Sequence, residues 1–576
     1  MPSIWKAKLL PFDKNLESPE IKGSIPLLID RILKVRGFNT PEEQNKVLSP
    51  KLSELQSPFL MLQMKEASLR LLEAFKKQEK ICIYADFDLD GTSGCALLKT
   101  GLLGLGFQNV VHYQPQRLAE GYGFHANAVE ELAQSGVSLI VTVDVGITSF
   151  AAAAKAKELG VDVILTDHHQ PLDKLPEAKF IVNPNQRGCT SKLGYLCGAG
   201  VAFYLLRAVK RALVDEGLIL ESQFDLRSVL DFLAIATLTD MVPLIGDNRA
   251  LTKVGLMELE KTNKAGLRAL LDELGLAGRP LTSQDVAIRF APKLNALSRM
   301  EMGLRPLDIY LIQDHAKARA LIGEVLENNQ NRVLLQSEGE GLALSMLDSW
   351  AEKKFVCLIH EKFHRGVVGL IATKVAMHTG LPTFIGSISA EGPVVGSGRL
   401  PPGSDYNLVG ALEKASAVLQ RFGGHPQAAG FELSSAGAHS QLNDGLRSYF
   451  AQDLRELQAR EIEYDAAVPG VEISEALLKW FDVLGPYGQS FEVPILRISN
   501  LVVESRKTLK GEHLKLVLRC QESQRQFEAL WFSPPKVDEA LFGEALEVLA
   551  ELQWNYFGGR TKMQLLIKEM KKQYEN

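Results

Sequence analysis

The sequence predicts an α/β protein built on a doubly wound parallel sheet, and two patterns support this prediction. In the first, short β-branched runs alternate with helical patterns between residues 80 and 169. Strands that alternate with helices form parallel sheets covered by helices. In the second, aspartates and histidines directly follow the β-branched runs. Ligands of such sheets bind beyond the carboxyl ends of the strands, so these polar residues are expected to meet at one edge.

Each element can be placed from its periodicity. Strands are expected in KICIYADFD (80–88), SLIVTVDVG (138–146) and VDVILTDHH (161–169). Helices are expected in GTSGCALLKTGLLGL (91–105), FHANAVEELAQSG (124–136) and SFAAAAKAKELG (149–160), of which the last two are amphipathic and closed by glycine. A further apolar stretch, SVLDFLAIATLTD (228–240), is typical of a buried helix that carries a carboxylate at its end.

Four short segments hold the candidate chemistry: ADFDLDG (85–91), TVDVGIT (142–148), TDHHQ (166–170) and TLTDMVPL (237–244). They supply Asp86, Asp88, Asp90, Asp144, Asp167, His168, His169 and Asp240. Carboxylates gathered at one point repel each other unless a cation neutralises them. Several Asp with one or two His suit Mn²⁺ or Mg²⁺ better than a sulfur-rich zinc site does. Two such ions would activate a water and clamp a phosphate for hydrolysis.

Each of these residues also has a simpler interpretation. A single Asp at a strand end is usually a turn residue or a helix N-cap. Adjacent histidines are more often surface or core residues than ligands. For Asp167 two interpretations stay open, a cap and a carboxylate that orients a histidine. Four such features in this order, each at a strand or helix end, favour the metal site.

The order DxDxDG, VDxG, DHH and TxxD resembles the DHH phosphoesterase superfamily, and within it the bacterial RecJ type of single-strand-specific DNA exonuclease. The resemblance extends over about residues 20–570. It is also carried by RGFNTPEEQNKVLSPKLSELQSPFLM (36–61), PQRLAEGYGF (115–124), IVNPNQ (181–186), GAGVAFYL (198–205), APKLNALSRM (291–300), FHRGVVGLIA (363–372), GSGR (396–399) and GGHPQAAGF (423–431).

The chain departs from the family pattern at three places. Ser298 stands where the family usually has the Gly of NAxGR, so a tight backbone approach is less secure there. Phe363 replaces the Trp of WHxGVxG, and GPYGQSFEVP (485–494) lacks the Asn-Pro of a similar family segment. None of the three positions is a proposed metal ligand.

The resemblance implies a role for each candidate residue. The implied metal ligands are Asp88, Asp90, Asp144, His168 and Asp240, and the implied catalytic residues are Asp86, Asp144, His168 and His169. The cofactor would be two ions of Mn²⁺ or Mg²⁺. The residues implied to bind substrate are Arg117, Arg299, Ser397, Arg399 and His425, the first four in a pocket for a 5′-phosphate. Taken singly, an Arg is more often part of a surface salt bridge, and His425 could be a core histidine.

Five domains are expected: an N-terminal lead-in (1–45), a DHH catalytic domain (46–265), a helical connector (266–350), an α/β DHH-associated domain (351–452) and an OB-like β-barrel (456–576). The connector contains a long helical pattern at 315–350, for which a dimerising coiled coil is the alternative. Five short strand-like segments after residue 456 resemble an OB barrel, a common single-strand binder.

Composition agrees with this organisation. The chain has 576 residues, 46% of them hydrophobic, which can fill several cores. A net charge of −5 argues neither for nor against DNA binding, because an aspartate cluster awaiting metals biases the sum. Six cysteines without a CxxC pair favour neither a zinc ribbon nor a disulfide framework. There is no run of 18 apolar residues and no apolar leader, so a cytoplasmic protein is expected.

Three functions compete at this point. The first is a 5′→3′ single-stranded-DNA exonuclease that releases mononucleotides in DNA repair and recombination, with a single-strand-binding protein and a RecQ-type helicase as candidate partners. The second is a DHH phosphodiesterase for short oligonucleotides or cyclic dinucleotides, but such relatives lack the C-terminal barrel. The third is a non-catalytic replication scaffold, which is disfavoured because every aspartate and histidine of the motifs is present.

Overall fold

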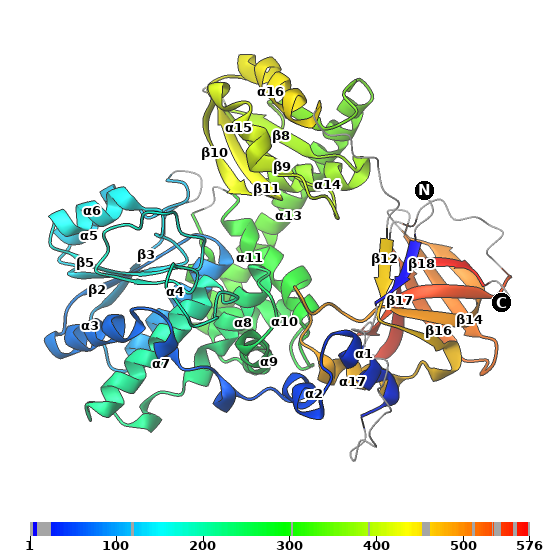
Figure 1. The fold of residues 1–576 in the computed structure, drawn as a ribbon, viewed down its shortest axis with the longest axis horizontal. Coiled ribbons are helices and arrows are strands. Elements are labelled where there is room, and N and C mark those ends of the chain that lie inside the picture. Colours follow the sequence, from blue (N-terminus) through cyan, green and yellow to red (C-terminus); the bar gives the residue numbers. More distant parts are fainter. Residues whose placement is uncertain are drawn as a thin grey trace.

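Three sheet-containing units and a long helix make up the protein (Figure 1). The computed structural model describes residues 4–8, 25–116, 120–300, 303–389, 392–451, 461–509, 513–532, 534, 543–556 and 561–573. In Figure 1 the first α/β unit lies at the left, the second at the top and a β-barrel at the right. This architecture confirms the predicted fold class.

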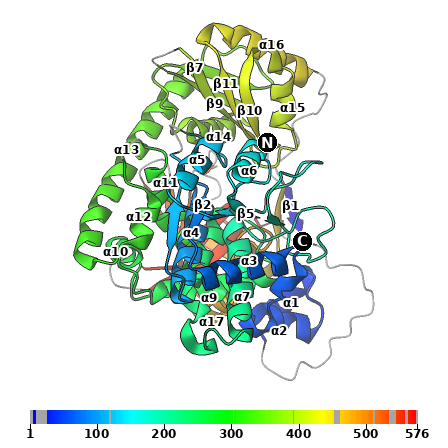
Figure 2. The same cartoon turned by 90° about the vertical axis from the view of Figure 1, so that its left-hand side faces the viewer.

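The first unit is the predicted parallel sheet, in the order β3-β2-β4-β5-β6. Its strands are β2 (Ile81–Ala85), β3 (Val110–Tyr113), β4 (Leu139–Val143), β5 (Asp162–Thr166) and β6 (Phe180–Val182). Successive side chains of a strand point to opposite faces, and each face has its own core. Ile81 and Ile83 pack with one set of helices, whereas Cys82 and Tyr84 pack with another. The sheet is therefore doubly wound, with helices on both sides (Figure 2).

The helices of this unit flank the sheet and continue into the connector. Those around the sheet are α3 (Met64–Lys77), α4 (Leu89–Gly104), α5 (Ala126–Gln134), α6 (Phe150–Glu158), α7 (Gly198–Asp215), α8 (Leu230–Thr239) and α9 (Asp247–Glu260). The connector holds α10 (Ala265–Glu273), α11 (Ala291–Leu297), α12 (Pro306–Leu311) and α13 (His315–Leu347). The predicted helices at 91–105, 124–136, 149–160 and 228–240 correspond to α4, α5, α6 and α8.

Helix α13 is the predicted long connecting helix and ends three residues before the predicted limit. Near its start, Ile322 and Val325 belong to the core of the first unit. Near its end, Ala343 belongs to a core of the second unit. Its apolar side chains thus pack within this chain at both ends, as expected of a connector rather than of a dimerising coiled coil.

The second α/β unit has a mixed sheet in the order β10-β11-β9-β8-β7. Its elements are β7 (Val356–His360), α14 (Val368–Thr379), β8 (Thr383–Ile388), β9 (Val394–Arg399), α15 (Leu408–Glu413), β10 (Leu419–His425), β11 (Ala428–Leu433) and α16 (His439–Ala451). The sequence did not predict the hairpin of β10 and β11. Its glycines and largely exposed β10 residues lack the apolar alternation that identifies a strand.

The third unit is a closed barrel, because β14 pairs with both β15 and β17. Its strands are β14 (Leu496–Thr508), β15 (Leu514–Cys520), β16 (Gln526–Trp531), β17 (Leu546–Asn555) and β18 (Lys562–Lys572). These are the five predicted strands. A short strand, β13 (Ala466–Pro469), is added parallel to β14, and α17 (Glu475–Leu484) precedes the barrel strands.

The N-terminal lead-in lies against the barrel rather than against the sheet that follows it in sequence. Strand β1 (Ile4–Ala7) pairs in parallel with β12 (Glu461–Tyr464), as Figure 1 shows. Helices α1 (Leu27–Val35) and α2 (Pro41–Leu48) follow. Directly after α1, Nε of Arg36 donates to Asp465 at 2.9 Å. Within the described residues, no helix is long and apolar enough to cross a membrane.

Candidate metal centre

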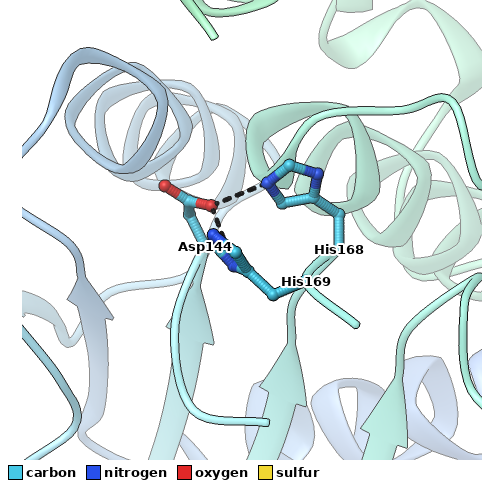
Figure 3. Close-up of side chains that lie close together, drawn as sticks. All are labelled: Asp144, His168 and His169. Atoms are coloured by element: carbon cyan, nitrogen blue, oxygen red, sulfur yellow. Dashed lines mark ion pairs between the residues drawn. The ribbon is translucent and has the colours of Figure 1, made fainter. Parts of the chain in front are cut away.

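The carboxyl ends of three adjacent strands bring the motif residues together. Asp86 follows β2, Asp144 follows β4, and the segment Asp167–His169 follows β5. Because β2, β4 and β5 are parallel neighbours, these ends share one edge of the sheet. Figure 3 shows the carboxylate of Asp144 pointing between the rings of His168 and His169. The predicted meeting point is therefore present.

Helix α4 presents the second and third aspartates of the DxDxD run. Asp88 is its N-cap, accepting hydrogen bonds from the N–H groups of Asp90 at 2.9 Å and Gly91 at 3.0 Å. Asp90 accepts from the N–H groups of Gly198 at 2.6 Å and Ala199 at 2.8 Å, at the start of α7. Each carboxylate is thus fixed by two backbone donors, which stabilise its charged form and its orientation.

Asp144 sits at the centre of the cluster in an unusual backbone conformation. Its φ is +62°, a left-handed value that costs energy for residues other than glycine and occurs often at functional sites. A Cβ on Gly198 would lie 2.4 Å from the Cβ of Asp144, so only glycine allows α7 to approach this closely. The fold therefore packs tightly around a strained aspartate.

Asp167 faces a histidine, as the second of its two interpretations predicts, and it caps no helix, because none begins after it. Its Oδ1 lies 2.7 Å from Nδ1 of His169 and accepts from the N–H of His168 at 2.8 Å. Its Oδ2 accepts from the N–H of Ile147 at 2.9 Å, in the loop after Asp144. Because Nδ1 of His169 faces Asp167, its Nε2 is the nitrogen left for other contacts.

Three overlapping groups of potential metal ligands lie in this cluster: Asp86, Asp88 and Asp144; Asp90, His168 and Asp240; and Asp144, His168 and His169. Asp240 ends α8, as predicted, and its Oδ2 lies 3.6 Å from Nε2 of His168. That nitrogen is 3.2 Å from Oδ1 of Asp144. All three of these buried atoms lack a hydrogen-bond partner among the described residues. Unpartnered buried oxygen and nitrogen atoms that converge are suited to Mn²⁺ or Mg²⁺.

The pKa shifts within the cluster also indicate that a cation would stabilise it. Burial, followed by the charge of Asp90, raises the pKa of Asp144 well above its usual value. Burial and the charges of Asp90 and Asp88 raise the pKa of Asp240 to about 9. Burial lowers the pKa of His169, but the hydrogen bond and charge of Asp167 outweigh it and raise the pKa to about 9. Without a cation, the cluster therefore favours protonated carboxylates and a protonated histidine.

These shifts predict how the stability of the metal-free protein depends on pH. Asp240 binds its proton more tightly when folded, so its ionisation destabilises the fold as pH rises from 3.8 towards about 9. His169 stabilises fully below its unfolded pKa of 6.5, and this contribution is lost as pH rises through about 9. In EDTA, the melting temperature should therefore fall between pH 6.5 and 9. Saturating Mg²⁺ should reduce this fall, and calorimetry showing no fall in EDTA would contradict the prediction.

Of the predicted 5′-phosphate residues, Ser397 and Arg399 of the second α/β unit and Arg299 of the connector lie around the start of α14, and Arg117 lies outside the described residues. Nη1 of Arg399 donates to Oγ of Ser397 at 2.6 Å. Its Nη2 would lie 2.8 Å from a Cβ on Gly369, so glycine lets the guanidinium rest against the first turn of α14. Nη1 of Arg299 lies 3.5 Å from the carbonyl oxygen of Gly366, just before α14. Two arginines and a serine thus surround a helix N-terminus, which favours anions.

His425 is placed near this group but is not a core histidine. It is exposed at the end of β10, where it pairs with Ala428 of β11. Ala428 pairs in turn with Arg399 of β9. Two inter-strand spacings, about 10 Å, therefore separate His425 from Arg399 along one row of the sheet.

The departures from the family pattern are accommodated. Ser298 has φ −73°, a helical value, so glycine is not required at this position. Phe363 is buried in the core beneath α14 and replaces a larger ring there.

Three residues to which the sequence analysis gave no role donate hydrogen bonds to the backbone of the metal motifs. Asn185 donates to the carbonyl oxygen of His168 at 2.6 Å, and Asn183 donates to that of His169 at 2.9 Å. Gln114, which is buried, donates to the carbonyl oxygen of Asp86 at 2.6 Å. Both asparagines belong to IVNPNQ, which the resemblance had singled out without a role, so a signal was present for them.

The chain matches three family models: the DHH family N-terminal domain over residues 80–237, the DHHA1 domain over 352–452 and the RecJ OB domain over 464–569. The single-stranded-DNA-specific exonuclease RecJ of Bacillus subtilis is 32% identical over 571 residues, which are 98% of this chain and 70% of that protein. RecJ of Escherichia coli is 29% identical over 96% of this chain and 97% of its own length.

Two solved structures of a RecJ protein are similar to this chain over most of its length. RecJ from Thermus thermophilus in complex with Mn²⁺ has a TM-score of 0.78 at 28% identity, covering 95% of this chain and 76% of that one. Its complex with Mg²⁺ has a TM-score of 0.72 at 26% identity, covering 95% of this chain and 75% of that one. On its motifs, its domain order and this full-length similarity, the chain belongs to the RecJ family of metal-dependent, single-stranded-DNA-specific exonucleases.

Proposed function

We propose that this exonuclease holds two divalent ions and removes mononucleotides from the 5′ end of single-stranded DNA. The observation that carries the two-ion proposal is that Asp144 belongs to two of the three ligand groups. A carboxylate shared between groups can bridge two ions at the short separation that in-line phosphate hydrolysis needs. The similarity to RecJ proteins in complex with Mn²⁺ and Mg²⁺ supports the choice of metal.

Each candidate residue then has a role. Asp86, Asp88 and Asp144 would hold one ion, and Asp90, Asp144, His168 and Asp240 the other. When bound, the ions supply an activated water and neutralise charge on the scissile phosphate. In its protonated form, with Nδ1 held by Asp167, His169 would donate its Nε2–H to the phosphate or to the leaving oxygen.

The polarity follows from the anion-binding group in the second α/β unit. Arg399 and Ser397, beside the first turn of α14, would bind the terminal phosphate of the strand. Arg299 and Arg117 would complete the pocket. His425 would lie close to the backbone of the nucleotide next to the terminal phosphate.

The direct test is digestion in Mn²⁺ of the same strand labelled at either end. Removal from the 5′ end predicts that a 5′ label appears at once as mononucleotide, while a 3′ label stays on progressively shorter strands. Early release of the 3′ label as mononucleotide would contradict the proposed direction.

The barrel is proposed to bind the rest of the strand. Arg506 and Lys507 are exposed on β14, and Lys507 lies directly opposite Lys515 of β15. Lys515 is paired with Glu528 at 2.9 Å, whereas Arg506 and Lys507 place positive charge along the exposed end of β14, which would attract a phosphate backbone. The barrel sequence also contains Arg519, which donates to Gln524, and Lys510, which lies outside the described residues.

The double substitution Arg506→Gln/Lys507→Gln should weaken binding to long single strands. It should also reduce the slope of log affinity against log salt by about 0.7 for each phosphate that the variant no longer binds. Cleavage of very short oligonucleotides should change little. Fluorescence anisotropy over a salt series measures the effect, with Lys77→Gln on α3 as a control for removal of a positive charge. Unchanged binding would contradict the proposal.

Deleting residues 456–576 would be a poorer test. The deletion would remove the partners of Arg36 and Arg249, which contact Asp465 and the carbonyl oxygen of Leu484 respectively. Weaker binding could then reflect a failure to fold.

The remaining proposals follow from the same assignment. The five predicted domains (1–45, 46–265, 266–350, 351–452 and 456–576) are proposed as the functional division of the chain. A RecQ-type helicase and a single-strand-binding protein are proposed as partners, because an enzyme specific for single strands needs opened DNA. The cytoplasm is the proposed location, and repair and recombination of DNA the proposed setting.

A further inference from the structure

Asp240 is held differently from the two aspartates that α4 presents to the metal centre. Asp88 and Asp90 each accept two backbone hydrogen bonds. The Oδ2 of Asp240 has no hydrogen-bond partner among the described residues. The N–H of Asp240 donates to the carbonyl oxygen of Ala236 at 2.9 Å, which ends α8. The position of this carboxylate therefore depends on its backbone, and so on the segment that follows it.

That following segment, residues 241–249, contacts the polypeptide that leads into the barrel. The N–H of Leu244 donates to the carbonyl oxygen of Gln489 at 2.8 Å. The side chain of Leu244 is buried, and a Cβ on Gly488 would lie 2.9 Å from its Cδ1. This contact is four residues from Asp240 and leaves no room for an added methyl group.

A second contact lies at the start of α9. Nη2 of Arg249 donates to the carbonyl oxygen of Leu484 at 2.8 Å, and Nη1 lies 3.3 Å from that of Pro486. The guanidinium carbon lies 3.9 Å from the centroid of the Phe491 ring. Arg249 is buried, so these contacts form inside the junction rather than at its edge. Residues 484–491, the barrel loop, thus hold the segment at both Leu244 and Arg249.

Residues 241–249 are also hydrogen-bonded to the first α/β unit, which carries the metal centre. These bonds make the segment rigid. Nδ2 of Asn248 donates to the carbonyl oxygens of Tyr195 at 2.7 Å and of Pro243 at 2.9 Å. The hydroxyl of Tyr204 donates to the carboxylate of Asp247. A displacement imposed at Leu244 is therefore transmitted along the backbone towards Asp240 rather than absorbed by a flexible loop.

From these contacts we infer that the barrel loop positions Asp240 in the metal centre, with Gly488, Leu244 and Arg249 as positioning residues. The inference rests on the proposed role of Asp240 as a metal ligand. The C-terminal barrel would then have a second role besides its proposed binding of DNA. The loop that leads into the barrel would set the position of Asp240, a candidate metal ligand in the first α/β unit.

Gly488→Ala tests the inference in the full chain with Mn²⁺ alone as the probe. Alanine fits this backbone, since the φ of Gly488 is not positive, but its methyl group must displace Leu244. The apparent affinity for Mn²⁺ by titration calorimetry should fall about tenfold, as when a residue supporting a ligand is removed. Leu244→Ala, which empties the same contact instead of overfilling it, should lower the affinity as well.

Gly470→Ala is the matched control. Its Cβ would also lie 2.9 Å from a leucine methyl, that of Leu501, but inside the barrel and away from residues 241–249. Mn²⁺ affinity should stay at the wild-type value, and the metal-free melting temperature of each variant reports any general destabilisation of the fold. An equal drop in affinity in Gly470→Ala would overturn the inference, because the effect would then come from the barrel as a whole.

Asp240→Ala separates the inference from the function on which it rests. If Asp240→Ala loses affinity while Gly488→Ala and Leu244→Ala bind Mn²⁺ like the wild type, the positioning role is wrong and the proposed metal site stands. If Asp240→Ala itself binds like the wild type, the ligand assignment fails and the inference fails with it.

Discussion

Replacing Asp144 with asparagine is expected to lower the rate of DNA hydrolysis in Mn²⁺ by at least about a hundredfold, the upper end of the cost of removing a residue that merely supports a ligand. The reason is that Asp144 belongs to two ligand groups and lies 3.2 Å from His168. Asparagine keeps the size of the side chain and tolerates the left-handed backbone, but it lacks the negative charge that would hold two ions together. Initial rates on a 5′-labelled strand measure the effect.

Stability separates this chemical effect from misfolding. Without metal, Asp144→Asn should melt at a higher temperature than the wild type at neutral pH, because the folded wild type must either bury the charge of Asp144 beside Asp90 or take up a proton, and asparagine needs neither. In Mn²⁺ the order should reverse, since the wild type gains more from binding. Asp173→Asn, the same chemical change at an exposed loop position, should alter neither property. A variant that keeps more than about a hundredth of the wild-type rate would exclude the bridging role.

The fold could be predicted where local pattern and tertiary structure agree. The parallel sheet was predictable because its buried strands are short, continuous, mostly apolar runs and because a helix separates β2 from β3, β3 from β4 and β4 from β5. The barrel strands were also predictable, since β15 and β16 alternate and the other barrel strands each contain apolar residues that are buried in the barrel. The hairpin of β10 and β11 was not, because β10 is rich in glycine and largely exposed, even though β11 buries Ala429, Phe431 and Leu433 in the core.

The convergence of the candidate metal ligands could be predicted because chemistry restricts such ligands to a few residue types, which here lie at strand and helix ends. The residues that hydrogen-bond to the backbone of the metal motifs could not be predicted. Gln114, Asn183 and Asn185 act through side-chain amides on backbone carbonyls, and amides in loops have no distinctive spacing. The contact between Arg249 and Phe491 joins residues 242 positions apart, and no local pattern encodes such a pair. Long-range support of this kind becomes visible only in the folded chain.

A strand that carries a 5′-phosphate is expected to be degraded faster than the same strand with a 5′-hydroxyl, and Arg399→Ala should remove most of that preference. A guanidinium paired with phosphate contributes on the order of 1.5–3 kcal/mol, or about 10- to 150-fold in the preference. Ser397 and Gly369 hold Arg399 against the first turn of α14, so its donors are already oriented before DNA binds. Competition between the two strand types in one reaction measures the preference directly.

A control variant and the total affinity for DNA show whether a reduced preference for the 5′-phosphate comes from loss of a specific pocket. Arg447→Ala removes the same charge from α16, which in Figures 1 and 2 lies on the side of the second α/β unit away from the first, and it should leave the preference intact. Arg399→Ala should reduce the total affinity for long strands much less than it reduces the preference, because the barrel contacts remain. If the preference and total affinity fall equally, Arg399 contributes only general attraction for DNA. If the wild-type enzyme does not distinguish the two ends, Arg399, Ser397 and the helix N-terminus do not form a terminal-phosphate pocket, and the assigned direction loses its structural basis.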